Sequence, residues 1–417
     1  MRSMRMIAPF SRSGGGARSG SREPRGSEGM MHLRFGAFVA PIHHAGQNPT
    51  LALQRDLELV QLLERLGYDE VWFGEHHTAG VELIPAPEIF IAHVAAQTSR
   101  IRLGTGAISL PYHNPLWVAD RMILLDHLTR GRAMCGVGPG SLPADAHMIG
   151  LTMPELRDAL EEDLPVLLHL LTDDEPISVK TARYELHEAR CQMRPFTHPR
   201  FEVAIPGVAS PIGPKLAGRY GLGLLSIASS TPQGFEALAG HWGILEEQAA
   251  AHGQSADRAR WRLTGHMHIA ETREQALKDI EYGFMDWFDY YQFSTAHPAF
   301  QLQGTTYEER LGFLMEAGAV VVGTPDDAIA ELERFWEQTN GGFGCYLHFE
   351  HEWVNPVAKR RHHELFAQYV MPHFQGQLTR PLANERWVRA GRDQNLAEAA
   401  QGLEQYMAKN APQPSAT

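Results

Sequence analysis

From Leu33 to about Phe374, short apolar runs alternate with longer segments whose apolar residues recur every three or four positions. The first pattern is typical of buried strands and the second of amphipathic helices. Gly67 ends one such helical segment as a stop signal. The predicted strands are 33–40, 70–74, 101–108, 133–137, 202–205, 222–227, 262–269 and 345–349, and the predicted helices are 50–66, 87–99, 115–128, 154–171, 213–220, 232–252, a segment from 273, 325–338 and 356–374.

This alternation predicts about eight βα units and therefore parallel strands joined by right-handed crossovers. Eight units in one chain favour a closed (β/α)8 TIM barrel of the α/β class over an open sheet. The first strand is not followed by GxGxxG, which weakens a dinucleotide-binding interpretation. Two segments interrupt the pattern: residues 176–194, which predict a hairpin insertion, and residues 284–318, an aromatic-rich excursion that we expect to act as a lid.

The two ends of the chain differ from this barrel region, which we place at 31–375. Residues 1–30 contain a stretch rich in Gly, Ser and Arg without periodicity, so we expect a disordered extension, with Met30 or Met31 as the natural start. Residues 376–417 form a polar C-terminal tail.

Composition narrows the class of protein. Of 417 residues, 43% are hydrophobic and 21% are charged, as in ordinary globular enzymes. No apolar run approaches the roughly 18 residues that span a membrane. The net charge of −12 argues against nucleic-acid binding, which needs a basic surface. The three cysteines lie far apart, so we expect a reducing, cytoplasmic location without disulfides.

The segment from Val71 to His77 is the strongest candidate for a functional site. An apolar strand breaks at Gly74 and is followed directly by Glu75, His76 and His77. These side chains either cap a turn or line a site, and parallel α/β folds place their chemistry at the carboxyl ends of strands. One carboxylate and two imidazoles together favour the functional interpretation.

Glycine-rich segments lie at the ends of three further predicted strands, at residues 104–107, 135–141 and 206–213. Small residues there leave room for a planar ring or a phosphate tail, and the last loop precedes a helix whose free N–H groups suit an anion. For Gly104 and Gly106, tight strand packing is an equally good explanation.

A catalytic metal is not expected, although the chain has 22 histidines. None of the histidine pairs has HExxH spacing, and adjacent histidines on a strand point in opposite directions. Because GxSxG is absent and no cysteine adjoins a histidine, nucleophilic hydrolysis is also poorly supported.

Several motifs resemble the bacterial luciferase-like family of flavin-dependent monooxygenases, most closely its limonene monooxygenase branch. The motifs that carry the resemblance are Gly74–His77, Ile101–Gly106, Pro111–Pro115, Leu125–Arg132, Ala217–Ser226, Met267–Ala276 and Val322–Pro325.

The resemblance implies a TIM barrel that takes reduced FMN (FMNH2) from a separate NAD(P)H:flavin reductase. With O2, such enzymes form a flavin C4a-(hydro)peroxide and oxygenate a small, apolar, terpene-like organic substrate; they are commonly homodimers. His76 matches the family's active-site base, and Glu75 would anchor the strand end beside the flavin. The cofactor-binding positions implied are Ala107, Gly138, Pro139, Gly140, Ser141, Val208, Ala209, Ser210, Gly213 and Ser226.

Two departures from luciferase itself bear on this resemblance. Pro139 stands where luciferase has a phosphate-holding arginine, and Ala209 stands where it has an acidic residue. We therefore expect no light emission, and phosphate binding through backbone donors or another cation. The alternatives are a deazaflavin-dependent oxidoreductase of the same fold and a non-catalytic flavin-binding protein; His76 and Glu75 count against the second.

Overall fold

The computed structural model describes residues 32–40, 42–294 and 303–410. They divide into two compact parts, one within residues 32–377 and the other within residues 378–410. The predicted N-terminal extension and residues 295–302 of the predicted lid lie outside the described residues.

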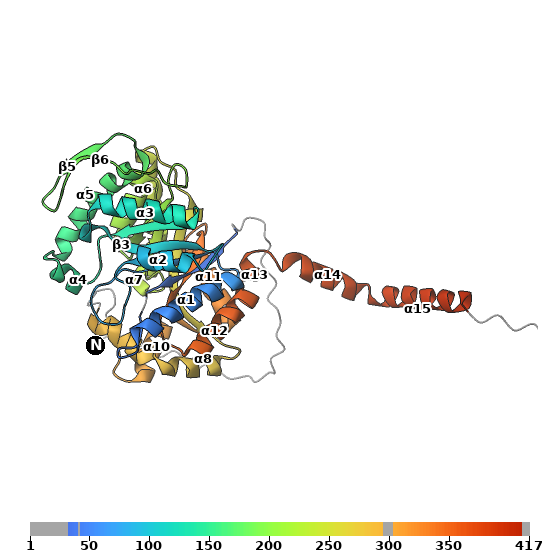
Figure 1. The fold of residues 1–417 in the computed structure, drawn as a ribbon. Helices are drawn as coiled ribbons and strands as arrows, with labels where there is room; N and C mark the ends of the chain where they lie inside the picture. The colour runs from blue at the N-terminus through green and yellow to red at the C-terminus, as the bar shows by residue number, and fades with distance from the viewer. Residues whose placement is uncertain (1–31, 41, 295–302, 411–417) are drawn as a thin grey trace, which may run out of the picture. The chain divides into compact units, whose positions relative to one another are not determined.

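Eight parallel strands close into a barrel, which confirms the predicted TIM barrel (Figure 1). The ring runs β1-β2-β3-β4-β7-β8-β9-β11 and returns to β1, while the short strand β10 pairs with the carboxyl half of β9. The strands are β1 Arg34–Val39, β2 Glu70–Phe73, β3 Arg102–Ser109, β4 Ala133–Gly138, β7 Glu202–Gly207, β8 Gly223–Ser226, β9 Trp261–Ile269, β10 Val320–Gly323 and β11 Cys345–Glu350.

Helices connect successive strands. They are α1 Pro49–Leu66, α2 Pro87–Ala95, α3 Pro115–Thr129, α4 Pro143–Met148, α5 Met153–Thr172, α6 Ile212–Tyr220, α7 Pro232–Ala251, α8 Arg273–Asp279, α9 Phe284–Asp289, α10 Tyr307–Glu316, α11 Pro325–Gln338, α12 Pro356–Leu365 and α13 Met371–Phe374. Helix α1 shows why the bounds fall where they do: the Asn48 side chain accepts the Thr50 N–H at its start, and Gly67 ends it with φ of 92°.

Some predicted bounds were wrong. The helix expected over 87–99 ends at Ala95, and the helix expected over 356–374 is interrupted by a π-helical turn, η6, at Phe366–Val370. Strand β10 and helix α4 were not predicted, because each has only four to six residues and shows too little periodicity.

The segments outside the repeating pattern also have structure. Strands β5 Ile177–Lys180 and β6 Glu185–Ala189 form an antiparallel hairpin. The described part of 284–318 contains α9, α10 and a π-helical turn, η4, at Tyr290–Ser294. The second part of the chain contains helices α14 Thr379–Ala390 and α15 Arg392–Lys409, neither of which has a buried residue.

The barrel interior is filled from the amino-terminal end by side chains at alternate strand positions. On β2, Val71 and Phe73 pack towards the helices, whereas Trp72 packs inside the barrel. A Cβ at Gly104 would lie 2.5 Å from the Trp72 ring, so the packing explanation holds for Gly104. Gly106 has a similar constraint, because its Cβ would lie 2.8 Å from Phe38.

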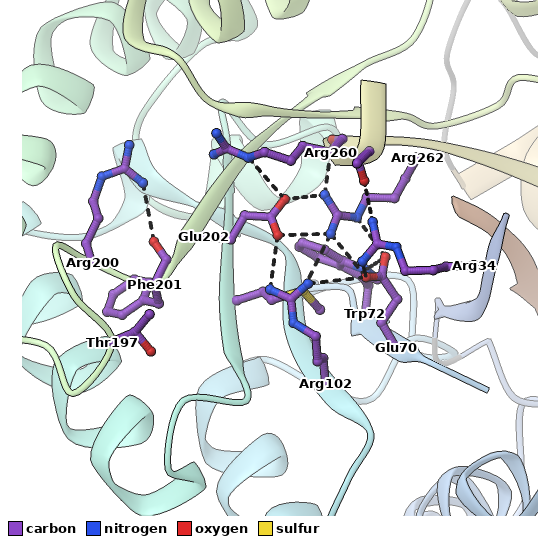
Figure 2. A network of polar contacts seen from close by, with 12 residues as sticks. Arg34, Glu70, Trp72, Arg102, Thr197, Arg200, Phe201, Glu202, Arg260 and Arg262 are labelled. Carbon is purple, nitrogen blue, oxygen red and sulfur yellow. Dashed lines mark hydrogen bonds and ion pairs between the residues drawn. The ribbon is translucent and has the colours of Figure 1, made fainter. Parts of the chain in front are cut away.

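A buried network of charges lies beneath Trp72, where the strands begin (Figure 2). The Arg262 guanidinium is fully buried and donates to both Glu70 and Glu202, with 2.7 Å between Nε and Glu70 Oε1. Arg34 and Arg102 contact the same two carboxylates at 3.2 and 3.0 Å. Every carboxylate oxygen of the network therefore has a cationic partner, and the network closes this end of the barrel.

Over the part of the chain that the structure describes, none of the helices is both long and apolar enough to cross a bilayer.

Candidate functional site

A cavity of about 420 Å³ opens where the barrel strands end. Catalytic sites of TIM barrels lie at this end, and the volume falls in the range typical of small-molecule sites. Its described lining residues are Phe38, Ala40, Gly74, Glu75, His76, Glu82, Gly106, Ala107, Ser109, Gly138, Pro139, Gly140, Ser141, Leu142, Met153, Arg157, Leu160, Ile205, Pro206, Gly207, Val208, Ala209, Ser210, Ile212, Gly213, Ile227, Ala228, His266, Tyr290, Tyr291 and Phe349.

His76 lies on the cavity wall between two carboxylates. Its Nδ1 is 3.3 Å from Asp145 Oδ2, and its Nε2 is 3.1 Å from Glu82 Oε2. The backbone N–H of His76 donates to Ile84 O, which folds the loop after β2 back and brings Glu82 beside the imidazole. Burial would lower the pKa of His76, but the two carboxylates outweigh it and raise that pKa.

Glu82 and Asp145 differ in their surroundings. Glu82 is buried, its Oε1 accepts a hydrogen bond from the Tyr290 hydroxyl of η4, and burial raises its pKa. Burial alone would raise the pKa of Asp145 as well. Hydrogen bonds from His76 and Thr78 outweigh burial, so the pKa of Asp145 is lowered. The two neighbours of His76 therefore have opposite tendencies to hold a proton.

Glu75 is an anchor for the strand end. Its Oε1 accepts from His77 Nε2 at 3.0 Å and His113 Nε2 at 2.9 Å, and its Oε2 accepts the Ser109 N–H at 2.9 Å. Burial opposes ionisation, yet these donors hold its pKa below the ordinary range. Glu75 fixes the ends of β2 and β3 relative to each other.

Two glycines allow β4 and α6 to pack closely against β7 at one side of the cavity. A Cβ at Gly138 would lie 2.8 Å from Pro206 Cγ, and a Cβ at Gly213 would lie 2.4 Å from Pro206 O. Beside them, a bulge in β3 between Thr105 and Ile108 brings Ala107 to the cavity. This wall is built from backbone and small side chains, which a flat ring can approach closely.

The same cavity has features that suit an anion. Helix α6 starts at Ile212 without a side-chain cap, and its first residues line the cavity, so its free N–H groups lie at the wall. Arg157 of α5 is the one arginine or lysine among the described lining residues, and no described side chain pairs with it. These groups fit a phosphate tail, and Arg157 is a cation that sequence reasoning did not identify.

The remaining wall is aromatic. Phe38, Tyr290, Tyr291 and Phe349 line it together with His266, whose ring stacks on Phe349 at 4.6 Å. Burial lowers the pKa of His266 to about 3, so this imidazole is neutral. An uncharged aromatic wall favours an apolar ligand.

Most of the residues predicted for the site meet in this cavity: Glu75, His76, Ala107, Gly138, Pro139, Gly140, Ser141, Val208, Ala209, Ser210 and Gly213. Ser226 is the exception. Its Oγ accepts the Trp261 indole N–H at 2.9 Å and it is almost fully buried, whereas the next residues, Ile227 and Ala228, line the cavity.

Sequence reasoning missed Glu82, Asp145, Arg157, His266 and Tyr290. Each lies in a loop, a helix or a strand interior without a recognisable motif. The Ser-Leu-Pro-Ala-Asp segment that places Asp145 in the first turn of α4 was the available signal, because Pro and Asp are typical of a helix start.

Three buried histidines, His348 of β11 and His362 and His363 of α12, lie close enough to share an ion. Their hydrogen bonds give them another arrangement. The Ile269 N–H donates to His362 Nδ1 at 3.0 Å, so the proton of that ring is on Nε2, which faces His348 Nδ1 at 3.4 Å. His362 Nε2 is then a donor and does not suit a metal ion.

Comparison with known proteins confirms the resemblance seen in the motifs. Residues 33–341 match the family described as luciferase-like monooxygenase. The chain is 44% identical over 344 residues to limonene 1,2-monooxygenase of Rhodococcus erythropolis, covering 82% of this chain and 87% of that protein. It is 42% identical over 361 residues to 4-hydroxyprotoasukamycin monooxygenase of Streptomyces nodosus subsp. asukaensis, covering 86% and 97%.

Among solved structures, the oxygenating constituent of 3,6-diketocamphane monooxygenase of Pseudomonas putida, in complex with FMN, matches with a TM-score of 0.68 at 23% identity. The match covers 82% of this chain and 99% of that chain. An F420-dependent secondary alcohol dehydrogenase matches with a TM-score of 0.62 at 19% identity, covering 82% and 99%. At these identities the likeness concerns the fold.

Proposed function

The chain belongs to the luciferase-like monooxygenase family, and we propose that it is the oxygenase component of a two-component system. It takes reduced FMN from a separate NAD(P)H:flavin reductase and uses O2 to insert one oxygen atom into a small, apolar, terpene-like molecule. The bound flavin supplies the two electrons that activate O2.

The cavity carries this proposal, because it joins a wall of backbone and small residues to an aromatic wall. The first wall, at Ala107, Gly138 and Gly213, has no large side chains and would suit the flat flavin ring. The aromatic wall, with Tyr291 and Phe349, suits an apolar substrate beside it. Limonene, which appears in the name of a relative 44% identical to this chain, is an apolar molecule of this kind.

The phosphate of FMN would lie against the N-terminus of α6 and the Arg157 side chain. Both line the cavity, and no acidic side chain of the described residues pairs with Arg157. A guanidinium is well suited to bind a phosphate through two parallel hydrogen bonds. Arg157 would thus replace the cation that Pro139 does not supply.

His76 would manage the proton of the reaction at Nε2, since Nδ1 is held by Asp145. Glu75 would keep the ends of β2 and β3 in place around it. The apolar residues around these groups limit the access of water, which protects a reduced flavin from unproductive reaction with O2.

We also propose a homodimer. Trp117, Leu124 and Leu128 recur on one face of α3 and are 59%, 49% and 61% exposed, and Ile89 of α2 is 68% exposed. Apolar side chains gathered on neighbouring helices are typical of a subunit interface. Light scattering on the wild type and on Trp117→Glu tests this: the wild type should be dimeric, and an equally dimeric variant would contradict this interface.

A single-turnover experiment tests the function. Protein with chemically reduced FMN is mixed with ¹⁸O2 and limonene, and the product is analysed by mass spectrometry. Incorporation of one ¹⁸O atom is expected. If FMNH2 binds but no oxygenated product forms with any apolar probe, the oxygenase assignment fails; binding of reduced F420 in place of FMNH2 would favour the deazaflavin alternative.

A further inference from the structure

We infer that Glu82 and Asp145 together hold His76 doubly protonated, so that the cavity wall presents a proton donor and the enzyme oxygenates electron-rich double bonds or sulfur atoms. The inference rests on the proposed function and deepens it by naming the substrate class. Glu82 acts through His76 and is therefore a positioning residue.

The first step concerns Nδ1 of His76. Asp145 Oδ1 accepts the Thr78 hydroxyl at 2.5 Å and the His77 N–H at 3.3 Å, and Oδ2 faces His76 Nδ1. A carboxyl group that receives two other donors is held as a carboxylate. Its free oxygen accepts, so Nδ1 of His76 carries a proton.

The second step concerns Nε2. It lies 3.1 Å from Glu82 Oε2, close enough for an ion pair but not aligned for a hydrogen bond, because Oε2 has no hydrogen-bond partner in the described residues. A carboxylate at that distance repels the lone pair of a bare imidazole nitrogen and attracts a protonated one, so its charge favours a proton on Nε2. Burial raises the pKa of Glu82, but the Tyr290 hydroxyl, which donates to Oε1, and the charge of the His76 imidazolium both favour the carboxylate form. With Glu82 as the carboxylate, the proton is on Nε2 of His76.

The other charged and titratable groups that face this pair agree with the assignment. Glu75 adds a third negative charge near the imidazole and favours its protonated form. Tyr112 and Tyr291 are neutral because burial raises their pKa values, and burial keeps His266 neutral. Arg157 is a cation on the same cavity wall. The pKa of His77 is raised by its hydrogen bond to Glu75, and that pairing reduces the effect of His77 on His76.

The chemical consequence follows from the balanced reaction, in which substrate, O2 and FMNH2 give oxygenated product, water and FMN. One oxygen atom of O2 forms a bond to the substrate, the O–O bond breaks, and the other oxygen atom takes up protons and leaves as water. A proton donor at the cavity wall assists the departure of that second atom. Oxygen transfer to an electron-rich alkene or thioether requires such assistance. Attack on a ketone instead requires an unprotonated oxygen nucleophile, and this wall disfavours it.

The first test reads the imidazole directly, in flavin-free protein labelled with ¹⁵N-histidine. Loss of its resonances in His76→Gln assigns the His76 ring. At pH 7.5 both ring nitrogens should show imidazolium shifts, with a titration midpoint above the ordinary histidine value of about 6.5. In Glu82→Gln the midpoint should fall towards that value. Glu331→Gln, which removes a buried carboxylate of α11 outside the cavity, should leave it unchanged.

A neutral His76 ring at pH 7.5 in the wild type, or an unchanged midpoint in Glu82→Gln, would overturn the inference. If Glu82→Gln does not fold, Tyr290→Phe replaces it, because it removes the hydroxyl donor and keeps the ring. In that variant the proton should move from His76 to Glu82, and an unchanged imidazolium spectrum would count against the inference.

The second test compares two probes in single turnovers with FMNH2 and O2: methyl phenyl sulfide and cyclohexanone. Sulfoxide should form with little lactone, and Glu82→Gln should form sulfoxide at least about tenfold more slowly. Preferential lactone formation would overturn the substrate class. If FMNH2 binds but neither these probes nor limonene is oxygenated while the imidazolium is observed, the proposed function fails and the protonation of His76 stands.

Discussion

At the amino-terminal end of the barrel Arg262 lies between Glu70 and Glu202, and at the carboxyl-terminal end His76 lies between Glu82 and Asp145. Both sets are buried ions or potential ions inside one barrel, and both combine a cationic group with two carboxylates. They differ in how completely their hydrogen bonds are satisfied.

At the amino-terminal end, arginines from three other strands or turns surround the two carboxylates, and the Trp72 ring covers the Arg262 guanidinium at 5.0 Å (Figure 2). The set is closed and has no atom left for a ligand. At the carboxyl-terminal end, Glu82 Oε2 has no hydrogen-bond partner in the described residues, and the set lines a cavity. A network whose polar atoms all have partners stabilises the fold. A network that leaves a polar atom without a partner beside a cavity can act on a ligand there.

The largest effect on stability is expected from Arg262→Met. It leaves two buried carboxylates without their central partner, which typically costs about 3–5 kcal/mol of unfolding free energy. Chemical denaturation measures the loss. The matched control is Arg361→Met, which removes an exposed pair with Glu271 and should cost less than about 1 kcal/mol. Equal losses in the two variants would show that the network contributes no more than a surface pair.

The next effect separates function from stability at the other end. His76→Ala should lower the single-turnover oxygenation rate by about 100- to 10,000-fold, because it removes the proton-transfer group. Its affinity for FMNH2 should change little, and its unfolding free energy should fall by less than in Arg262→Met, because burial raises the pKa of Glu82 and this carboxyl group can take up a proton when its partner is removed. His187→Ala, on the exposed hairpin, serves as the control. Full activity in His76→Ala would remove this residue from the mechanism.

A smaller effect is expected at Arg157, which we propose binds the FMN phosphate. Arg157→Ala should weaken FMN binding by about tenfold or more, since a charged hydrogen bond contributes about 1.5–3 kcal/mol. Riboflavin lacks the phosphate, so its affinity should be the same in wild type and variant. Equilibrium titration of both flavins measures the difference, and an equal loss for riboflavin would place Arg157 elsewhere than at the phosphate.

The smallest effect concerns pH. Burial lowers the pKa of His266 and His348 to about 3, so these groups stabilise the fold above the unfolded value of about 6.5 and lose that contribution as the pH falls below it. The pKa of Glu202 is lowered to about 2, mainly by Arg262 against the effect of burial, so its contribution lasts until the pH falls below about 4.5.

The contribution of His43 to stability has the opposite dependence on pH. Burial opposes its protonation, but Asp56 and Glu352 raise its pKa to about 9, so its contribution is present below about 6.5 and is lost as the pH rises through 9. Unfolding curves from pH 4 to 10 should therefore show greatest stability near pH 6.5, with a decline below it from the buried histidines and a decline towards pH 9 from His43. In His348→Leu the decline below pH 6.5 should be shallower, and an unchanged acid limb would contradict the role given to the buried histidines.

The sequence predicted the barrel because βα alternation is repeated and each strand reads as an apolar run. Glu75 and His76 could also be predicted from the sequence, because they lie just after the apolar run of β2. Ser226 was misplaced because successive strand residues point in opposite directions: its hydroxyl faces Trp261, and the cavity begins one residue later.

Glu82, Asp145 and Tyr290 could not be found in this way. They approach His76 from a returning loop, a six-residue helix and a π-helical turn, and only tertiary packing brings them together. The network at the amino-terminal end was equally hidden, because Glu70 and Arg262 read as ordinary polar residues at strand starts.

The most direct test of the central claim is an anaerobic titration of the protein with FMNH2, followed by mixing with O2 in the presence of an apolar alkene. The account predicts saturable binding of FMNH2 that Gly138→Leu abolishes, because that side chain would fill the flavin wall, and one oxygen atom in the product. Absence of FMNH2 binding to the wild type, or binding unaffected by Gly138→Leu, would contradict the assignment of this cavity as the flavin site.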